Sequence, residues 1–334
     1  MFKYDWSQFD AKTGLIFMAG VLLVFNVMGD SEFAWFAAGT SALLAWVTIL
    51  LVPPQSLRRD LMGLAVYLVA GAALTWLGVV LAASTAALII AMFVVTFVGY
   101  MMLLWGAQAF MVAWCAVYWF MLVPLFMGTH DLGGILYGHV IGTGTVIALN
   151  VLKPLWAGKP KGETPEAEPS EPATNQEYSL GYMLRYAGIV ATSIAGGTAL
   201  GIRFLTADPT VIANATINII SPSFAQVWHN AVERVVLASL GIIIGFYLGW
   251  FFPGELFGHL LTTVAAFAAL AMTRVSFGLL IGFLFIMIAY PWGVMHTDAG
   301  HLIANEKLIG ELIGIVIAVL AIGLLTRLKR ADPA

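Results

Sequence analysis

Apolar residues in this chain fall in runs of about 18–22 positions, a length that spans the hydrocarbon core of a bilayer as a helix. The runs are apolar all round, whereas a helix at the surface of a soluble protein keeps one polar face. The pattern predicts an all-α integral membrane protein with about twelve transmembrane helices. We expect them at 12–29, 33–52, 60–82, 85–104, 108–127, 133–152, 183–204, 210–228, 233–252, 255–272, 275–294 and 306–326.

The polar segment between the sixth and seventh runs differs from the short loops. Between Ala157 and Tyr178 it carries four prolines and five glutamates. Such a segment has too little apolar surface to fold and too much proline to form a helix. We therefore predict a first six-helix unit at 1–156, a cytoplasmic linker at 157–178 and a second six-helix unit at 179–334.

Composition agrees with a membrane protein and excludes several other classes. The chain is 61% hydrophobic and 10% charged, whereas soluble proteins are about a quarter charged. A net charge of −3 does not indicate a nucleic-acid partner. The lone Cys115 lies in an apolar run, and no GxxxxGK[ST] motif is present, so we expect no metal, no cofactor and no intrinsic ATPase.

Basic residues indicate the orientation in the membrane. With the N-terminus placed in the cytoplasm, 13 of the 15 lysines and arginines lie on the cytoplasmic side, and only Arg203 and Lys307 lie outside. Cytoplasmic loops of membrane proteins show this excess of positive charge. Both termini are therefore expected in the cytoplasm.

The two halves share short patterns. Six residues separate Pro124 from Asp131, and six separate Pro291 from Asp298. The sixth run of the first half contains Gly-His-Val-Ile-Gly from residue 138, and the last run of the second half contains Gly-Glu-Leu-Ile-Gly from residue 310. Since each half has an even number of spans, the repeat is expected to be parallel, with its pseudo-two-fold axis along the membrane normal.

A further set of basic, proline and glycine positions carries a resemblance to a known family. The positions are Lys12, Trp35, Pro53, Pro54, Arg58, Arg59, Gly63 and Gly71 in the first half, and Arg185, Pro222, Arg234, Gly241, Gly245 and Gly249 in the second. In this pattern the chain resembles the fusaric acid resistance family, also called the aromatic acid exporter family, as a compact member without the large cytoplasmic domain. The resemblance implies a bacterial inner-membrane exporter of aromatic or other hydrophobic carboxylic acids that works with a periplasmic membrane-fusion adaptor.

Two ionisable residues at matching positions of the repeat are the first candidates for chemistry. A charge in mid-membrane costs about 2.5–3.5 kcal/mol, so such residues tend to face a cavity, a partner or a pathway. His139 and Glu311 would bring an imidazole and a carboxylate near the pseudo-axis, a pair suited to proton coupling. The alternative is that both lie close to the outer surface and contact water.

Two further clusters are candidates. His130, Asp131, His296 and Asp298 lie in equivalent outer loops and would form a proton exit, a metal site or solvated loops. On the cytoplasmic side, arginines could recognise organic anions, or they could only anchor the chain at the membrane surface. That cluster comprises Arg58, Arg59, Asp60, His229, Glu233 and Arg234. We expect Glu233 to neutralise its neighbour Arg234, and Asn214 and Asn218 to bond between helices.

The leading hypothesis is therefore a proton-coupled exporter of hydrophobic organic anions, not an enzyme. The expected partners of the protein are the organic anion, the lipid bilayer and the periplasmic adaptor, and the sequence is compatible with a homo-oligomer. The alternatives are a membrane enzyme that uses His130 and His296, and a non-transporting subunit of a larger assembly. No nucleophile elbow or HExxH pattern supports the enzyme.

Overall fold

The computed structural model describes residues 6–12, 14–16, 18–20, 32–52, 56–123, 132–157, 179–206, 208–220, 224–273, 275–294 and 298–331. Every regular element in these ranges is a helix, as predicted. Two are short 3-10 helices, η1 (Trp6–Gln8) and η2 (Met102–Trp105). The α-helices are α2 (Glu32–Leu50), α3 (Leu57–Leu81), α4 (Thr85–Met101), α5 (Ala107–Leu122), α6 (Leu132–Ala157), α7 (Leu180–Phe204), α8 (Val211–Ile219), α9 (Phe224–Phe251), α10 (Glu255–Ala271), α11 (Phe277–Val294) and α12 (Asp298–Ala331).

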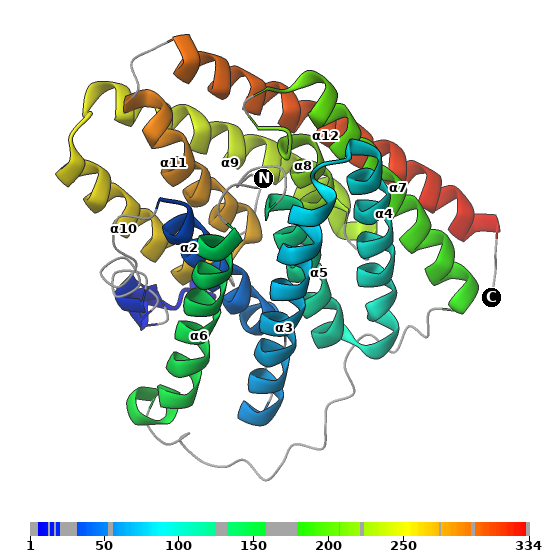
Figure 1. Cartoon of the computed structure of the whole chain (residues 1–334), viewed down its shortest axis with the longest axis horizontal. Helices are drawn as coiled ribbons and strands as arrows, with labels where there is room; N and C mark the ends of the chain where they lie inside the picture. Colours follow the sequence, from blue (N-terminus) through cyan, green and yellow to red (C-terminus); the bar gives the residue numbers. More distant parts are fainter. Residues whose placement is uncertain are drawn as a thin grey trace.

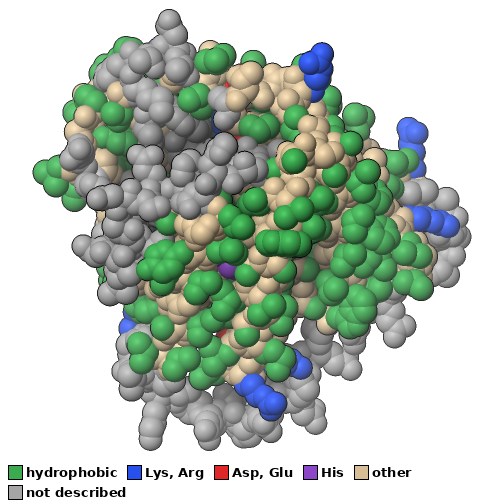
Figure 2. Space-filling model, in the orientation of Figure 1, with side chains coloured by type: hydrophobic (Ala, Val, Ile, Leu, Met, Phe, Trp, Pro, Cys, Tyr) green, Lys and Arg blue, Asp and Glu red, His purple; other side chains and the backbone are tan. Residues whose placement is uncertain are grey.

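Six of these helical segments are long and apolar enough to cross a membrane. They are Leu57–Leu81, Thr85–Trp105, Leu132–Leu152, Leu180–Phe204, Val232–Phe251 and Gly300–Arg327. Large apolar side chains on them are exposed, for example Val69 at 70% and Leu320 at 68%. Figure 2 shows hydrophobic side chains over most of the described surface of one face, with Lys and Arg near its edges. The chain is thus an all-helical protein with helices suited to a membrane, while the count of twelve spans stays a prediction.

One predicted span is wrong. The hydrophobic run at 210–228 is not a single helix, because α8 has nine residues and ends at Ile219, and α9 already begins at Phe224. Nine helical residues cover about 13 Å, less than half of a bilayer core. Pro222 explains the break, because proline disfavours the helical conformation of the residue before it and donates no backbone hydrogen bond. The predicted span at 12–29 and the linker lie largely outside the described residues.

Helix packing brings distant segments together. In the first half α2 packs along α6, and α3 packs against α5 and α6; in the second half α8 packs along α12, and α9 packs against α11 and α12. The two halves meet where α4 packs against α7 and where α5 reaches α8. Figure 1 shows α4, α7 and α12 next to one another, with the start of α7 and the end of α12 on the same side of the molecule.

Glycines permit the closest of these contacts. A Cβ on Gly142 of α6 would lie 2.2 Å from the carbonyl oxygen of Ala38 on α2. A Cβ on Gly314 of α12 would lie 2.5 Å from the carbonyl oxygen of Ile212 on α8. Small residues let helix backbones approach this closely in membranes. The contact places the next ionisable residues of α6 and α12, His139 and Glu311, inside the protein.

Candidate functional site

An ion pair joins α9 to α12 inside the apolar part of the protein. Arg234 Nη2 lies 3.1 Å from Glu311 Oε1, and the two side chains are only 3% and 2% exposed. Glu311 lies in the middle third of the apolar segment Gly300–Arg327. Removing two charges from water costs several kcal/mol for each ion. A fold that keeps this pair in its interior therefore has a strong structural or functional reason for it.

Asn214 of α8 connects the ion pair to the first half of the chain. Its side-chain oxygen accepts a hydrogen bond from Arg234 Nη2 at 3.3 Å and one from Asn218 Nδ2 at 2.6 Å. It also accepts a hydrogen bond from the hydroxyl of Tyr118 on α5 at 2.6 Å. The prediction that Asn214 bonds between helices is thus confirmed, whereas Asn218 bonds within its own helix. We call Tyr118, Asn214, Asn218, Arg234 and Glu311 the polar cluster.

The polar cluster presents both donors and acceptors that no group in the described part of the chain uses. Nε and Nη1 of Arg234, which carry most of the donor hydrogens of a guanidinium, form no hydrogen bond with the described residues. The same holds for Oε2 of Glu311 and Oδ1 of Asn218. A buried polar group without a partner costs about 1–3 kcal/mol. The cluster therefore suits a polar or anionic ligand that accepts hydrogen bonds from the guanidinium.

A second buried ion pair lies one turn from Glu311 on α12. Lys307 Nζ bonds to Asp208 Oδ2, and Asp208 Oδ1 also accepts a hydrogen bond from the Thr210 backbone at 2.9 Å. The ring of Phe285 lies 5.4 Å from Lys307 Nζ and 5.9 Å from the guanidinium carbon of Arg234. The sequence pattern places Lys307 on the outer side of the membrane and does not predict this pair. The i, i+4 spacing of Lys307 and Glu311 is the signal that would have put both on one helix face.

His139 belongs to a different network. Its Nε2 lies 3.0 Å from the carbonyl oxygen of Leu68 and therefore donates, and its Nδ1 lies 2.7 Å from Oγ of Ser41 and accepts in the neutral ring. Trp119 and Tyr67 pack against the ring at centroid distances of 4.8 and 5.4 Å. Both ring nitrogens thus have partners within the first half. The sequence pattern predicts His139 and Glu311 together near the pseudo-axis, whereas in the structure the two residues bond to different sets of partners.

The predicted cytoplasmic cluster is also divided. Arg58 and Arg59 are exposed at the start of α3, and Asp60 is buried there. Arg234 lies inside the protein, and Glu233 bonds to Ser276. The expectation that Glu233 neutralises Arg234 is wrong, because adjacent residues of a helix do not face each other and Glu311 takes that place.

The other candidate site residues fall outside the described part of the structure or have side chains that it does not describe. His130, Asp131 and His296 lie outside the described residues, and the side chains of His229 and Asp298 are not described although their helices are. Within the part of the chain that is described, no group of three or more His, Cys, Asp or Glu side chains could hold a metal ion.

Comparison with family models, with curated proteins and with solved structures finds no match to this chain. The polar cluster and the fold around it therefore carry the evidence on function.

Proposed function

We propose that this chain is a transporter that exports small hydrophobic organic acids across a membrane, with the polar cluster as its substrate and proton site. The observation that carries the proposal is Arg234. It is a buried guanidinium among apolar helices and, among the residues that the structure describes, it has one carboxylate partner and keeps donors that no group uses. Arginine recognises carboxylates through a planar fork of donors. An organic anion is the ligand that best fits those donors.

Glu311 supplies a way to couple this binding to protons. While Glu311 is ionised, it holds Nη2 of Arg234 through the 3.1 Å contact. Protonation of Glu311 would release that contact and leave the guanidinium for the carboxylate of a substrate. Release of the proton would restore the pair and expel the anion, so the proton and the anion move in the same direction and export runs down the outward gradient of the acid. Tyr118 and Phe285, which adjoin Asn214 and Arg234, supply aromatic surface for the apolar part of the substrate.

The fold supports a transporter in two further ways. The pairings of α2 with α6, α3 with α5, α3 with α6 and α4 with α5 recur as α8 with α12, α9 with α11, α9 with α12 and α10 with α11. This supports two parallel halves that share one pattern of helix packing. α8 ends at Ile219, directly after Asn218 of the polar cluster, and helices interrupted at the binding site are a feature of transporters.

The remaining parts of the proposal rest on sequence patterns. The asymmetry of Lys and Arg supports cytoplasmic termini. The resemblance to the aromatic acid exporters supports a bacterial inner membrane, aromatic or other hydrophobic carboxylates as substrates, and a periplasmic adaptor as partner. His139, with both ring nitrogens engaged in the first half, is assigned a structural role in this proposal.

The test is transport by the purified full chain in liposomes. Radiolabelled benzoate or phenylacetate is loaded, a pH gradient is imposed, and flux is compared with that of empty liposomes. We expect wild-type flux that depends on the gradient, loss of at least tenfold in Arg234→Gln, and loss of the gradient dependence in Glu311→Gln. Arg203→Gln, an exposed arginine at the end of α7, is the matched control and should match wild type.

Two outcomes would overturn the proposal. Wild-type flux in both Arg234→Gln and Glu311→Gln would remove the polar cluster from the pathway. A wild-type chain that moves neither acid above the empty-liposome level would favour the interpretation as a non-transporting subunit.

A further inference from the structure

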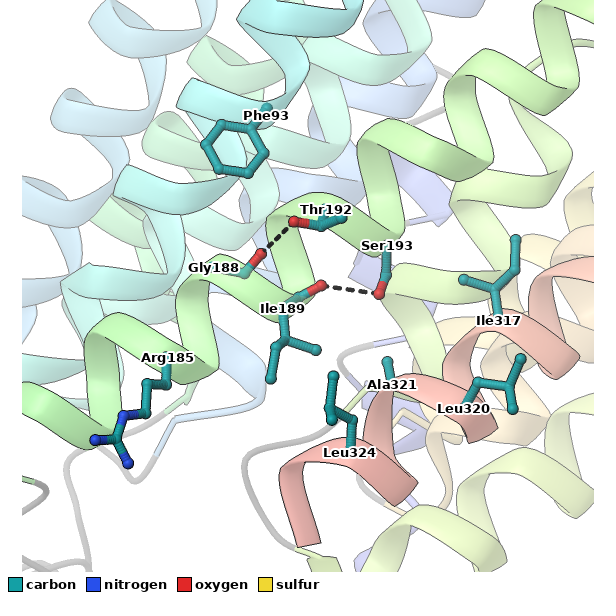
Figure 3. Close-up of a pocket in the computed structure, with 10 residues that line it drawn as sticks. All are labelled: Phe93, Arg185, Gly188, Ile189, Thr192, Ser193, Ile317, Leu320, Ala321 and Leu324. Carbon is teal, nitrogen blue, oxygen red and sulfur yellow. Dashed lines mark hydrogen bonds between the residues drawn. The ribbon is translucent and has the colours of Figure 1, made fainter. Parts of the chain in front are cut away.

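A surface groove runs between α4, α7 and α12, and its lining residues do not include those of the polar cluster. Its volume is about 830 Å³, within the range of sites that bind drug-sized ligands. Figure 3 shows Phe93 on one side, Ile317, Leu320 and Leu324 on the other, and α7 beneath them. The groove is elongated along α7, with Arg185 and Leu324 at one end and Ser193 and Ile317 at the other.

The floor of the groove suits a hydrocarbon chain. Gly188 and Ala321, the two smallest residues of its lining, leave room between the larger apolar side chains. The two hydroxyl groups in it donate to their own helix: Thr192 bonds to the carbonyl oxygen of Gly188 and Ser193 to that of Ile189, both at 2.8 Å. Since these hydroxyl hydrogens are engaged, the groove offers a polar ligand little to bind along its length.

One end of the groove is basic. Arg185 lines it and is exposed. Arg327 is also exposed and follows Leu324 by three residues on α12, which places both on one helix face at the same end. Two arginines next to an apolar groove complement a ligand with an anionic head and an apolar tail. Basic pockets between membrane helices bind acidic lipid head groups in this way.

We propose that this groove is a binding site for an anionic phospholipid, with one acyl chain along α7 and α12 and the phosphate at Arg185 and Arg327. The site is separate from the polar cluster and does not depend on the proposed transport. With the proposed orientation, Arg185 and Arg327 lie at the cytoplasmic leaflet, and this placement alone rests on the proposed function.

The first arm of the test compares lipids on the purified full chain in detergent. Dioleoyl phosphatidylglycerol should raise the midpoint of thermal unfolding by several degrees more than dioleoyl phosphatidylcholine does. Native mass spectrometry should show one or two retained phosphatidylglycerol molecules. Inorganic phosphate added with phosphatidylcholine should not reproduce the shift, which separates a lipid head group from a free anion.

The second arm uses matched variants of α7. A Cβ on Gly188 meets nothing within 4 Å, so Gly188→Leu fills the groove without a clash at the backbone. Gly196 is also open and exposed but does not line the groove, so Gly196→Leu is its control. We expect the preference for phosphatidylglycerol to disappear in Gly188→Leu and in the double variant Arg185→Gln/Arg327→Gln, and to persist in Gly196→Leu.

Three results would overturn the inference. Equal stabilisation of wild type by the two lipids would mean ordinary contact with the bilayer. Retention of the preference in both Gly188→Leu and the double arginine variant would place the lipid elsewhere. A concentration-dependent dimer that Gly188→Leu abolishes would show that a second copy of the chain occupies the groove. None of these results depends on whether benzoate is transported.

Discussion

Lys307 and Glu311 lie one turn apart on α12, and each is held by an oppositely charged residue from a different part of the second half. Lys307 pairs with Asp208, which precedes α8, and Glu311 pairs with Arg234 of α9. Four buried charges thus tie α12 to the segment before α8 and to α9 within a short stretch of the structure. The two pairs differ in one respect: Asp208 has other donors, whereas Arg234 keeps nitrogens that have no partner among the described residues.

The Arg234–Glu311 pair should show strong coupling in a double-mutant cycle. Glu311→Leu leaves the Arg234 charge buried without its carboxylate partner, and the loss of one member of a buried pair costs about 3–5 kcal/mol. The double variant Arg234→Met/Glu311→Leu removes both charges and should regain most of that stability. Thermal unfolding in detergent measures the stability of the double variant and of the single variants Arg234→Met and Glu311→Leu. If the two single losses of stability simply add up in the double variant, the charges do not interact.

Lys307→Met should destabilise the chain less than Glu311→Leu does. The carboxylate of Asp208 that remains still accepts two hydrogen bonds from Thr210, one from the backbone N–H and one from the hydroxyl. The expected loss is about 1–3 kcal/mol, the cost of leaving a buried polar group partly satisfied. The companion variant Lys307→Met/Thr210→Val removes one of the remaining donors, so its unfolding midpoint should fall further. An equal midpoint for the two variants would contradict this account.

Gly71 is the residue that makes room for the His139 ring. A Cβ at this position would lie 2.3 Å from Cε1 and 2.4 Å from Nε2 of His139. Gly71→Ala should therefore displace the ring from Ser41 and Leu68 and cost about 1–3 kcal/mol, as overpacking does. Gly144→Ala on α6, where a Cβ meets nothing within 4 Å, is the control and should leave the unfolding midpoint unchanged.

A His139→Ala background tests the clash between Gly71→Ala and the His139 ring independently. In a His139→Ala background the ring is absent, so Gly71→Ala should have little further effect on the unfolding midpoint. A full loss of stability in that background would mean that the glycine is needed for a reason other than the ring.

Hydropathy located most helices, because a helix buried in lipid must be apolar along its whole length. It failed at 210–228, where the average over a window hides the effect of Pro222 on the backbone. It also failed to find the partner of Arg234, since 77 residues separate it from Glu311 and only the packing of α9 on α12 brings them together. The sequence did single out His139 and Glu311 as ionisable residues in apolar runs, and Arg234 as a member of a cytoplasmic cluster. Which of them meet is decided by tertiary contacts that a single sequence does not record.

Tyr118 provides a test of whether the two halves move at the polar cluster. Its hydroxyl, on α5 of the first half, donates to Asn214 on α8 of the second half at 2.6 Å. Tyr118→Phe removes this bond alone, and Asn214 still accepts from Arg234 and Asn218, so the loss of stability should be only about 0.6 kcal/mol, a typical value for a hydrogen bond between membrane helices.

Transport should change more than stability in Tyr118→Phe if substrate release requires the halves to separate here. We expect the maximal rate of benzoate export to change at least threefold, with a shift of a few degrees at most in the unfolding midpoint. Tyr137→Phe, an exposed tyrosine on α6, is the matched control and should alter neither. An unchanged rate in Tyr118→Phe together with an unchanged midpoint would show that this contact between α5 and α8 plays no part in the transport step. If the export rate and the unfolding midpoint fall together, Tyr118 has a purely structural role.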